Sequence, residues 1–288
     1  MVDLTDLKLN NVEFFCRNGE LYGEVKSKEL NACYELKDVT FQSPAEGILM
    51  DLDGTTLDSE GFWVYIIQTT MAKLMGDPKF TLEDADEPFV SGYTTVEHLR
   101  YCINKYCKDK KIEDANAIYH ITASEELEKV MKGAGNANAF RPNEGLKEFL
   151  LEVKRRGIKI GLATSGLKYK AIPEIVSVFR QLDMGDPLKF YDGIITGGDR
   201  KTAGVYGTVG EIASKPHPFI YSELAHLGLN VKDDSRVLGI EDSSAGVLSL
   251  RFAGFPVVGL NTGNISKSGL DGFCYKKVDN LMEILEVL

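Results

Sequence analysis

The sequence predicts an α/β protein with a doubly wound, Rossmann-like core built on a parallel sheet. From residue 142 onward, short apolar runs alternate with stretches of helical periodicity, which is typical of strands joined by right-handed helical crossovers. Between residues 61 and 138 the pattern is helical, which predicts an all-helical insertion into the core. The expected organisation is an N-terminal β extension at 1–45, the core at 46–60 and 139–288, and the helical insertion at 61–138.

The N-terminal extension carries a β-hairpin signal. Residues 12–17 and 20–25 flank Asn18-Gly19, a dipeptide that favours a two-residue turn between antiparallel strands. Residues 33–41 are a further candidate strand. Two interpretations remain open: the extension is a lid, dimer edge or partner site, or it packs on the edge of the sheet, and we favour the second.

Three segments of the insertion show the helical pattern. Apolar residues of the segment 62–75 stand three and four positions apart, and the segments 96–106 and 118–131 follow the same pattern. Residues 133–138 are small and polar, as in a hinge or linker. The helices therefore read as an insertion that is joined to the core by two short linkers, the other one at 57–60.

The remaining segments of the core follow in alternation. Strands are expected at 158–163, 193–196, 236–240 and 256–260, and helices at 145–156, 170–182, 218–227, 245–252 and 281–288. A strand at 48–50 precedes them all.

Composition limits the class of partner. The chain has 288 residues, of which 43% are hydrophobic and 26% charged, as in a globular protein. Its net charge of −10 argues against nucleic acid as a substrate but permits a small phosphorylated metabolite. Five cysteines without a Cys-x-x-Cys pair suit reduced, mostly buried thiols. With no leader pattern and no apolar run of about 18 residues, we expect a cytoplasmic protein without membrane contact, as a monomer or weak dimer.

A pair of carboxylates follows the first core strand directly. Ile48, Leu49 and Met50 form an apolar run that stops at Asp51 and Asp53. Ionised carboxylates are rarely clustered unless a positive group lies between them. Because ligands of open parallel sheets bind at the carboxyl ends of the strands, we interpret this stretch as a candidate active site.

Three later motifs could complete the site, and we call them, together with the motif that contains Asp51 and Asp53, the four stations. Thr164, Ser165 and Gly166 follow the strand at 158–163, where a hydroxyl and backbone amides can hold phosphate oxygens. Lys215 lies in Ser-Lys-Pro-His-Pro, where two prolines restrict the backbone around one cation. Glu241-Asp242 follows the strand at 236–240 and precedes a helix. Two of these stations are weak alone, but together they point to one site.

In this order and spacing the four stations resemble the haloacid dehalogenase superfamily. The first station, Asp-Leu-Asp-Gly-Thr-Thr-Leu-Asp-Ser-Glu, and the last, Glu-Asp-Ser-Ser-Ala-Gly, look most like its β-phosphoglucomutase-like phosphatase branch with a helical cap. The resemblance covers residues 46–288 and does not reach the N-terminal extension. It implies a phosphoric monoester hydrolase that works through an aspartyl-phosphate.

The resemblance also implies a role for each station. Asp51 would be the nucleophile and Asp53 the general acid and base. The catalytic set would be completed by Thr164 and Lys215, and the substrate would be bound by the amides of Leu52 and Ser165, by Gly166, and in the cap by Thr95. Mg²⁺ would be held by the Asp51 carboxylate, the Asp53 carbonyl and Asp242, with Glu241 bound directly or through water.

Several functions remain open at this point. The favoured one is a magnesium-dependent phosphatase of a small sugar or polyol monophosphate. A β-phosphoglucomutase-type phosphomutase is the alternative, but Trp63 occupies the position of that family's histidine and Thr95 that of its cap arginine. Asp53 argues against a dehalogenase or phosphonatase. A catalytically idle, metal-binding regulatory protein is a third possibility, which turnover of an aryl phosphate would exclude. The loop 197–214 is expected to line the entrance to the site.

Overall fold

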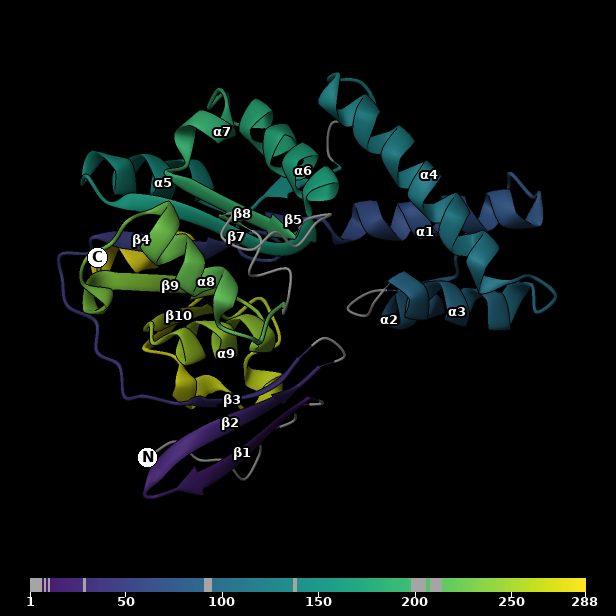
Figure 1. Ribbon diagram of the computed structural model, residues 1–288. Coiled ribbons are helices and arrows are strands. Elements are labelled where there is room, and N and C mark those ends of the chain that lie inside the picture. Colours follow the sequence, from purple (N-terminus) through teal and green to yellow (C-terminus); the bar gives the residue numbers. More distant parts are fainter. Residues whose placement is uncertain are drawn as a thin grey trace.

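The core is a six-stranded, wholly parallel sheet with the strand order β11-β10-β9-β4-β7-β8 (Figure 1). It is seen in a computed structural model that describes residues 7, 9, 11–27, 30–90, 95–136, 139–197, 206–207 and 214–288. Its strands are β4 (Gly47–Asp51), β7 (Lys159–Leu167), β8 (Gly193–Gly197), β9 (Val237–Glu241), β10 (Val257–Leu260) and β11 (Lys276–Val278). The prediction of a doubly wound α/β core is confirmed.

Helices cover both faces of the sheet, because side chains of a buried strand alternate between them. Ile48 and Met50 of β4 join one apolar cluster, and Leu49 joins the other. The first cluster includes residues of α5 (Leu146–Arg155) and α6 (Lys168–Gln181), beside which lies α7 (Pro187–Phe190). The second includes α8 (Phe219–Glu223), its π-helical continuation Leu224–Gly228, and α9 (Ser244–Ala253).

The helical segment extends to one side of the sheet (Figure 1). Its helices are α1 (Glu60–Met75), α2 (Glu87–Val90), α3 (Thr95–Tyr106) and α4 (Ile112–Met131). The strands β5 (Leu57–Asp58) and β6 (Arg141–Pro142) pair with each other and so bring the two connections to the core together. Helix α4 begins six residues earlier than the predicted 118, because Ala115 already continues the buried face that contains Tyr119.

The N-terminal segment forms a separate antiparallel sheet of β1 (Val12–Arg17), β2 (Glu20–Lys26) and β3 (Asn31–Glu35). The predicted hairpin is present, with Asn18 and Gly19 both at positive φ (54° and 88°). The sheet packs against α9 and not on an edge strand of the core, so the favoured interpretation of its position was wrong. The third strand ends at Glu35 and not at 41, because the chain beyond it hydrogen-bonds to the core: the Gln42 N–H donates to the Ser235 carbonyl.

The C-terminal part differs from the prediction in two places. Strand β11 has only three residues, too few for a recognisable alternating pattern, and it pairs with the edge of β10. Residues 281–288 form no α-helix but a 3₁₀ helix, Leu281–Glu286, capped by the Asn280 side chain. Shorter 3₁₀ turns lie at Asp84–Asp86, Asp234–Arg236, Ser266–Ser268 and Asp271–Phe273. Among the helices that the structure describes, none is long and apolar enough to span a membrane.

Candidate active site

The strand register brings three of the four stations to the same edge of the sheet. Asp51 of β4 lies opposite Ala163 of β7, so that Thr164 comes next on that side. Met50 lies opposite Ile240 of β9, so that Glu241 comes next on the other side. The chain passes from β8 to β9 across β4, which makes the end of β4 a topological switch point of the sheet.

Lys215 joins the nucleophile candidate to the last station. Its ammonium donates to Asp51 Oδ1 and, at 2.6 Å, to Glu241 Oε1. Burial raises the pKa of Asp51 well above its usual range, while the Lys215 charge opposes that rise. For Lys215 itself burial lowers the pKa, but the charges of Asp51 and Glu241 outweigh burial and raise it. The lysine therefore stays charged in a site that is closed to bulk water, with its side chain 7% exposed.

Glu241 is fully engaged by protein donors. Its Oε1 accepts from Lys215 and from the Tyr221 hydroxyl at 2.6 Å. Its Oε2 accepts from the backbone N–H of Asp242 and of Ser243, both at 3.1 Å, and from the Ser243 hydroxyl at 3.0 Å. Gly246 is required beside it, because a Cβ at that position would collide with the Glu241 carboxylate. Five donors use the lone pairs that one carboxylate offers, so Glu241 acts by holding Lys215 in place.

Asp51, Glu241 and Asp242 form the one group of carboxylates among the described residues that could hold a metal ion, with ligand atoms within 4.8 Å of one another. Asp242 Oδ1 accepts a hydrogen bond from Thr55 at 3.2 Å. Burial and the neighbouring Glu241 raise the pKa of Asp242 to about 7. Gly54, at φ 87°, lies so close that a Cβ would overlap the Asp242 carboxylate. Clustered, desolvated oxygens of this kind suit a hard divalent cation such as Mg²⁺.

Asp53 faces the cavity and is oriented by one hydroxyl. Ser59, the residue before α1, donates a hydrogen bond to Asp53 Oδ1. Desolvation by the surrounding side chains raises the pKa of Asp53, and the hydrogen bond from Ser59 lowers it in part. A raised pKa favours the protonated carboxyl that a general acid needs.

Thr164 lies next to the nucleophile candidate, and the Gly166 amide of the same station already donates a hydrogen bond to its side chain. Thr164 is 2% exposed, and its Oγ1 accepts the Gly166 N–H at 2.9 Å. The Thr164 oxygen acts as an acceptor in this bond, so its hydroxyl proton can be donated to another group, and the neighbouring Ser165 is exposed. Gly166, predicted to bind substrate, has its amide committed to Thr164 and contributes to the cavity only as a wall.

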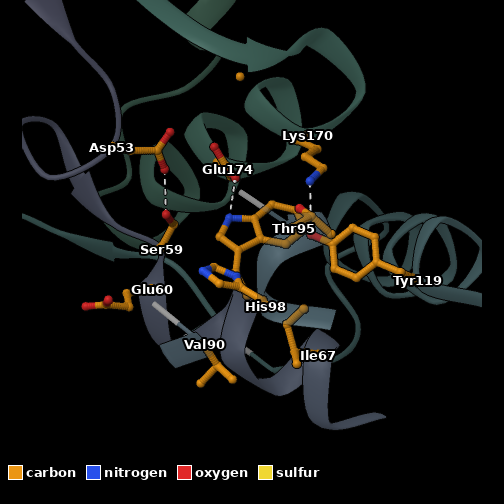
Figure 2. A pocket seen from close by; sticks show the side chains of 12 residues that line it. Asp53, Ser59, Glu60, Ile67, Val90, Thr95, His98, Tyr119, Lys170 and Glu174 are labelled. Atoms are coloured by element: carbon orange, nitrogen blue, oxygen red, sulfur yellow. Dashed lines mark hydrogen bonds between the residues drawn. The ribbon is translucent and has the colours of Figure 1, made fainter. Parts of the chain in front are cut away.

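A cavity of about 330 Å³ opens between these residues and the helical segment (Figure 2). Its wall comprises Asp53, Ser59, Glu60, Trp63, Ile67, Val90, Thr95, His98, Tyr119, Gly166, Lys170 and Glu174. Thr95, the predicted cap contact, is among them, together with Trp63. Residues 91–94 of the predicted cap motif, and 198–205 and 208–213 of the predicted entrance loop, lie outside the described residues.

The sequence analysis missed two charged side chains of this cavity, Lys170 and Glu174. Trp63 Nε1 donates to Glu174 Oε1 at 3.1 Å, and the Lys170 ammonium lies 4.2 Å from the centre of the Trp63 ring. Lys170 also donates to the Tyr119 hydroxyl at 3.0 Å. Burial raises the pKa of Glu174 well above its usual range and lowers that of Lys170. The available signal was their spacing of four residues on the helix that follows Thr164.

Comparison with known proteins agrees with this geometry. Residues 48–260 match a family model described as haloacid dehalogenase-like hydrolase. A solved structure of a putative β-phosphoglucomutase from Thermotoga maritima has a TM-score of 0.61 and 24% sequence identity, and the match covers 84% of this chain and 97% of that one. For a putative phosphatase from Clostridium difficile the values are 0.60 and 20%, with 86% and 100% covered.

A predicted phosphoglycolate phosphatase from Haemophilus somnus has a TM-score of 0.59 at 17% identity, with 84% of this chain and 97% of that chain covered. At such identities the structures establish the fold alone, whereas the family model covers well over half of the chain. The family membership predicted from the four stations is thereby confirmed, and so is the prediction that the protein is an enzyme. The chain belongs to the haloacid dehalogenase-like hydrolase family.

Proposed function

We propose that the protein is a magnesium-dependent phosphatase that hydrolyses a small sugar or polyol monophosphate through an aspartyl-phosphate on Asp51. The observation that carries the proposal is the contact of Lys215 with both Asp51 and Glu241 at the switch point of the sheet. A buried carboxylate beside a fixed cation is suited to attack phosphorus, because phosphoryl transfer needs positioning and charge stabilisation above all.

The phosphoryl group would be gripped from two sides. Lys215 presents its charge from the loop before α8, and the Thr164 hydroxyl and Ser165 amide lie at the end of the core part of β7, beside β4. The Leu52 amide directly follows the nucleophile and completes the predicted set. Such donors stabilise the charge that develops on phosphoryl oxygens in the transition state.

Asp53 would move the proton. Held by Ser59 and facing the cavity, it can protonate the oxygen of the leaving alcohol and then take a proton from the water that attacks the aspartyl-phosphate. Its raised pKa supports the first step, and the loss of its proton in that step prepares it for the second.

The residues present fit a magnesium ion. Asp51, Asp242 and the Asp53 carbonyl would hold it, whereas Glu241 is saturated by protein donors and would act through Lys215 or a water. Bound there, Mg²⁺ supplies positive charge that offsets the negative charge of the carboxylates and the phosphate.

The cavity supports a neutral, hydroxylated leaving group. Aromatic walls from Trp63 and Tyr119 alternate with hydrogen-bonding side chains, a lining that suits a polyol of a few carbons. The Lys170 ammonium already contacts the Trp63 and Tyr119 rings and the Tyr119 hydroxyl. The neighbouring Glu174 is an acid, so this wall has no further cation for a charged leaving group.

One observation favours a phosphomutase instead. Lys170 is a cation in the cavity wall, and an ammonium at this place can hold the second phosphate of a bisphosphate. A hexose 1-phosphate supplied with a trace of its 1,6-bisphosphate separates the two candidates. Faster formation of the 6-phosphate than of free phosphate would establish the mutase.

The proposal is tested by phosphate release from a panel of sugar and polyol monophosphates and from p-nitrophenyl phosphate, with magnesium present. We expect release from several of them, and release at background level from Asp51→Asn, whose amide keeps the shape but cannot attack. If no substrate of the panel is turned over, or if Asp51→Asn retains substantial activity, the proposed function is wrong.

A further inference from the structure

The N-terminal sheet lies next to α9, the helix that follows Asp242 (Figure 1). Strand β2 is in direct contact with α9, because a Cβ at Gly23 would collide with the ring of Phe252. Phe14 of β1 packs on Phe252 and on Phe273, with ring centres 6.3 and 5.4 Å apart. Tyr34 of β3 packs on Phe252 at 5.4 Å. The sheet is therefore docked on the core over an aromatic contact.

The same sheet reaches the loop that carries Lys215. His217, two residues after the lysine, is 1% exposed. Its Nδ1 shares a hydrogen bond of 2.7 Å with the Tyr34 hydroxyl, and Ser27 lies 3.3 Å from its Nε2. On the other side, the Ser249 hydroxyl of α9 donates to the His217 carbonyl at 2.7 Å. The loop is thus held between the extension and the core.

Lys215 depends on where this loop lies. Its ammonium must reach Asp51 and Glu241 at once, with the side chain almost wholly enclosed. A bridging contact of this kind tolerates little displacement, and a shift of about 1 Å in a catalytic group can lower a rate by about a hundredfold. A contact that holds His217 therefore also holds the lysine.

We infer that Tyr34 is a positioning residue: through His217 it keeps Lys215 in contact with Asp51, and the N-terminal sheet is thereby a working part of the active site. This inference rests on the proposed function, since it assigns Tyr34 to the same reaction. The extension lies outside residues 48–260, the part that matches the haloacid dehalogenase-like family, so the inferred role is an addition to the family's fold.

The test compares two single hydroxyl deletions in the full chain. Tyr34→Phe keeps the ring on Phe252 but removes the bond to His217, and kcat for p-nitrophenyl phosphate should fall by about fivefold to tenfold with less than about a twofold change in KM. Tyr22→Phe is the matched control, because Tyr22 lies in the same sheet and its ring stacks on the exposed Phe15. It should leave both constants unchanged.

A second background separates positioning from general weakening. Lys215→Arg replaces the ammonium by a guanidinium and so alters the contact with Asp51 and Glu241. In this background Tyr34→Phe should change the residual kcat by less than about twofold, because the contact that Tyr34 supports is already altered. An unchanged kcat in Tyr34→Phe, or the same loss in both backgrounds, would overturn the inference.

A readout that needs no turnover keeps the inference distinct from the proposed function. Lysine labelling by trinitrobenzenesulfonate, followed by peptide mass spectrometry, reports the access to each amine. Labelling of Lys215 should accelerate by at least about threefold in Tyr34→Phe but not in Tyr22→Phe, while Lys170 serves as the internal reference. If wild type releases no phosphate but this acceleration appears, the proposed function fails and the positioning role stands; without acceleration the positioning role is wrong.

Discussion

At the scale of single residues, the candidate active site carries an excess of negative charge. Asp51, Glu241 and Asp242 crowd around one ammonium, that of Lys215, and their mutual repulsion contributes to the raised pKa of Asp51 and Asp242. One cation does not neutralise three carboxylates, so an added divalent cation is expected to relieve the site and to admit a phosphate. Asp51 and Asp242 each accept one side-chain hydrogen bond, and since Asp51 is the candidate nucleophile, Asp242 is the metal ligand that can be tested separately from the chemistry.

Asp242→Asn should therefore raise the magnesium concentration needed for half-maximal activity by at least about tenfold, since removal of a charged ligand weakens binding of a hard cation. Activity is titrated with magnesium after treatment with a chelator. Asp271→Asn, a change at an exposed acid that pairs with Lys277 and is not part of the carboxylate cluster, is the control and should leave the titration unchanged. Full activity of wild type in excess chelator would contradict the metal site.

Lys170 can decide what kind of leaving group the cavity accepts. If the leaving group is a neutral polyol, Lys170→Met should lower kcat/KM for the best monophosphate by less than about tenfold, because only one hydrogen bond to an uncharged hydroxyl and the ring contacts are lost. If a second phosphate binds there, the loss should exceed about a hundredfold, because a charge-assisted contact disappears. The measurement is kcat/KM for a monophosphate and a bisphosphate of the same sugar.

At the scale of elements, α6 serves both the core and the cavity. Ala171, Ile175 and Val178 pack it on the sheet, whereas Lys170 and Glu174 line the cavity. Farther along the same helix, Arg180 donates to the carbonyls of Val130 and Met131 at the end of α4. Helix α6 therefore forms part of the cavity wall and also binds the end of the inserted helices.

Within the inserted helices, a buried carboxylate fastens α3 to the segment before it. Asp86 is 0% exposed and accepts hydrogen bonds from the Tyr101 hydroxyl and the Lys105 ammonium, both at 2.6 Å, and from the Tyr106 hydroxyl. Burial alone would raise the pKa of Asp86, but the bonds from Lys105, Tyr101 and Tyr106 together lower it. The ionised form is thus the one that stabilises the fold.

Asp86→Asn should lower the free energy of unfolding by about 2 kcal/mol at pH 7, where the full contribution of the carboxylate is present. Because the folded pKa is lowered, this contribution persists above the unfolded value of about 4 and declines as the pH falls below it. Urea unfolding followed by the fluorescence of Trp63, the single tryptophan, reports it. Asp84→Asn, at an exposed neighbour, is the control. A difference between wild type and Asp86→Asn that does not shrink between pH 5 and 3 would contradict this account.

At the scale of the whole molecule, the cavity lies between the inserted helices and the sheet, and only two connections join these parts. The β5–β6 pair brings both connections to one place, close to Ser59 and therefore to Asp53. Two contacts join α6 to α4: Lys170 donates to the Tyr119 hydroxyl, and the Tyr169 hydroxyl lies 3.1 Å from His120 Nδ1. If the inserted helices act as a moving cap, a substrate would enter when these contacts separate and the connections bend.

Limited trypsin digestion can follow this motion. Lys132 is exposed at the end of α4, just before the linker, and cleavage after it should slow by at least about threefold when magnesium and a phosphate analogue such as beryllofluoride are bound. Cleavage after Lys108, exposed in the turn between α3 and α4, should not change and provides the control. Equal rates at Lys132 with and without the ligand would count against a closing cap.

The sequence alone was sufficient to predict the sheet core, the inserted helices and the hairpin, because each depends on a local pattern. An apolar run that ends in Asp51 and Asp53, or in Glu241 and Asp242, marks the carboxyl end of a buried strand without reference to any other part of the chain. The resemblance of these stations to a known family then predicted that they would meet, and the register of β4 with β7 and β9 brings three of them to one edge.

Other features were decided only by the tertiary structure. The Trp63–Glu174 and Tyr34–His217 bonds join residues 111 and 183 positions apart, and neither leaves a periodic trace in the sequence. The same holds for the docking of the N-terminal sheet on α9, since an exposed strand pattern does not say which surface will cover it. A contact between distant segments depends on how the intervening chain folds, and so its chemistry appears only once the packing brings both partners together.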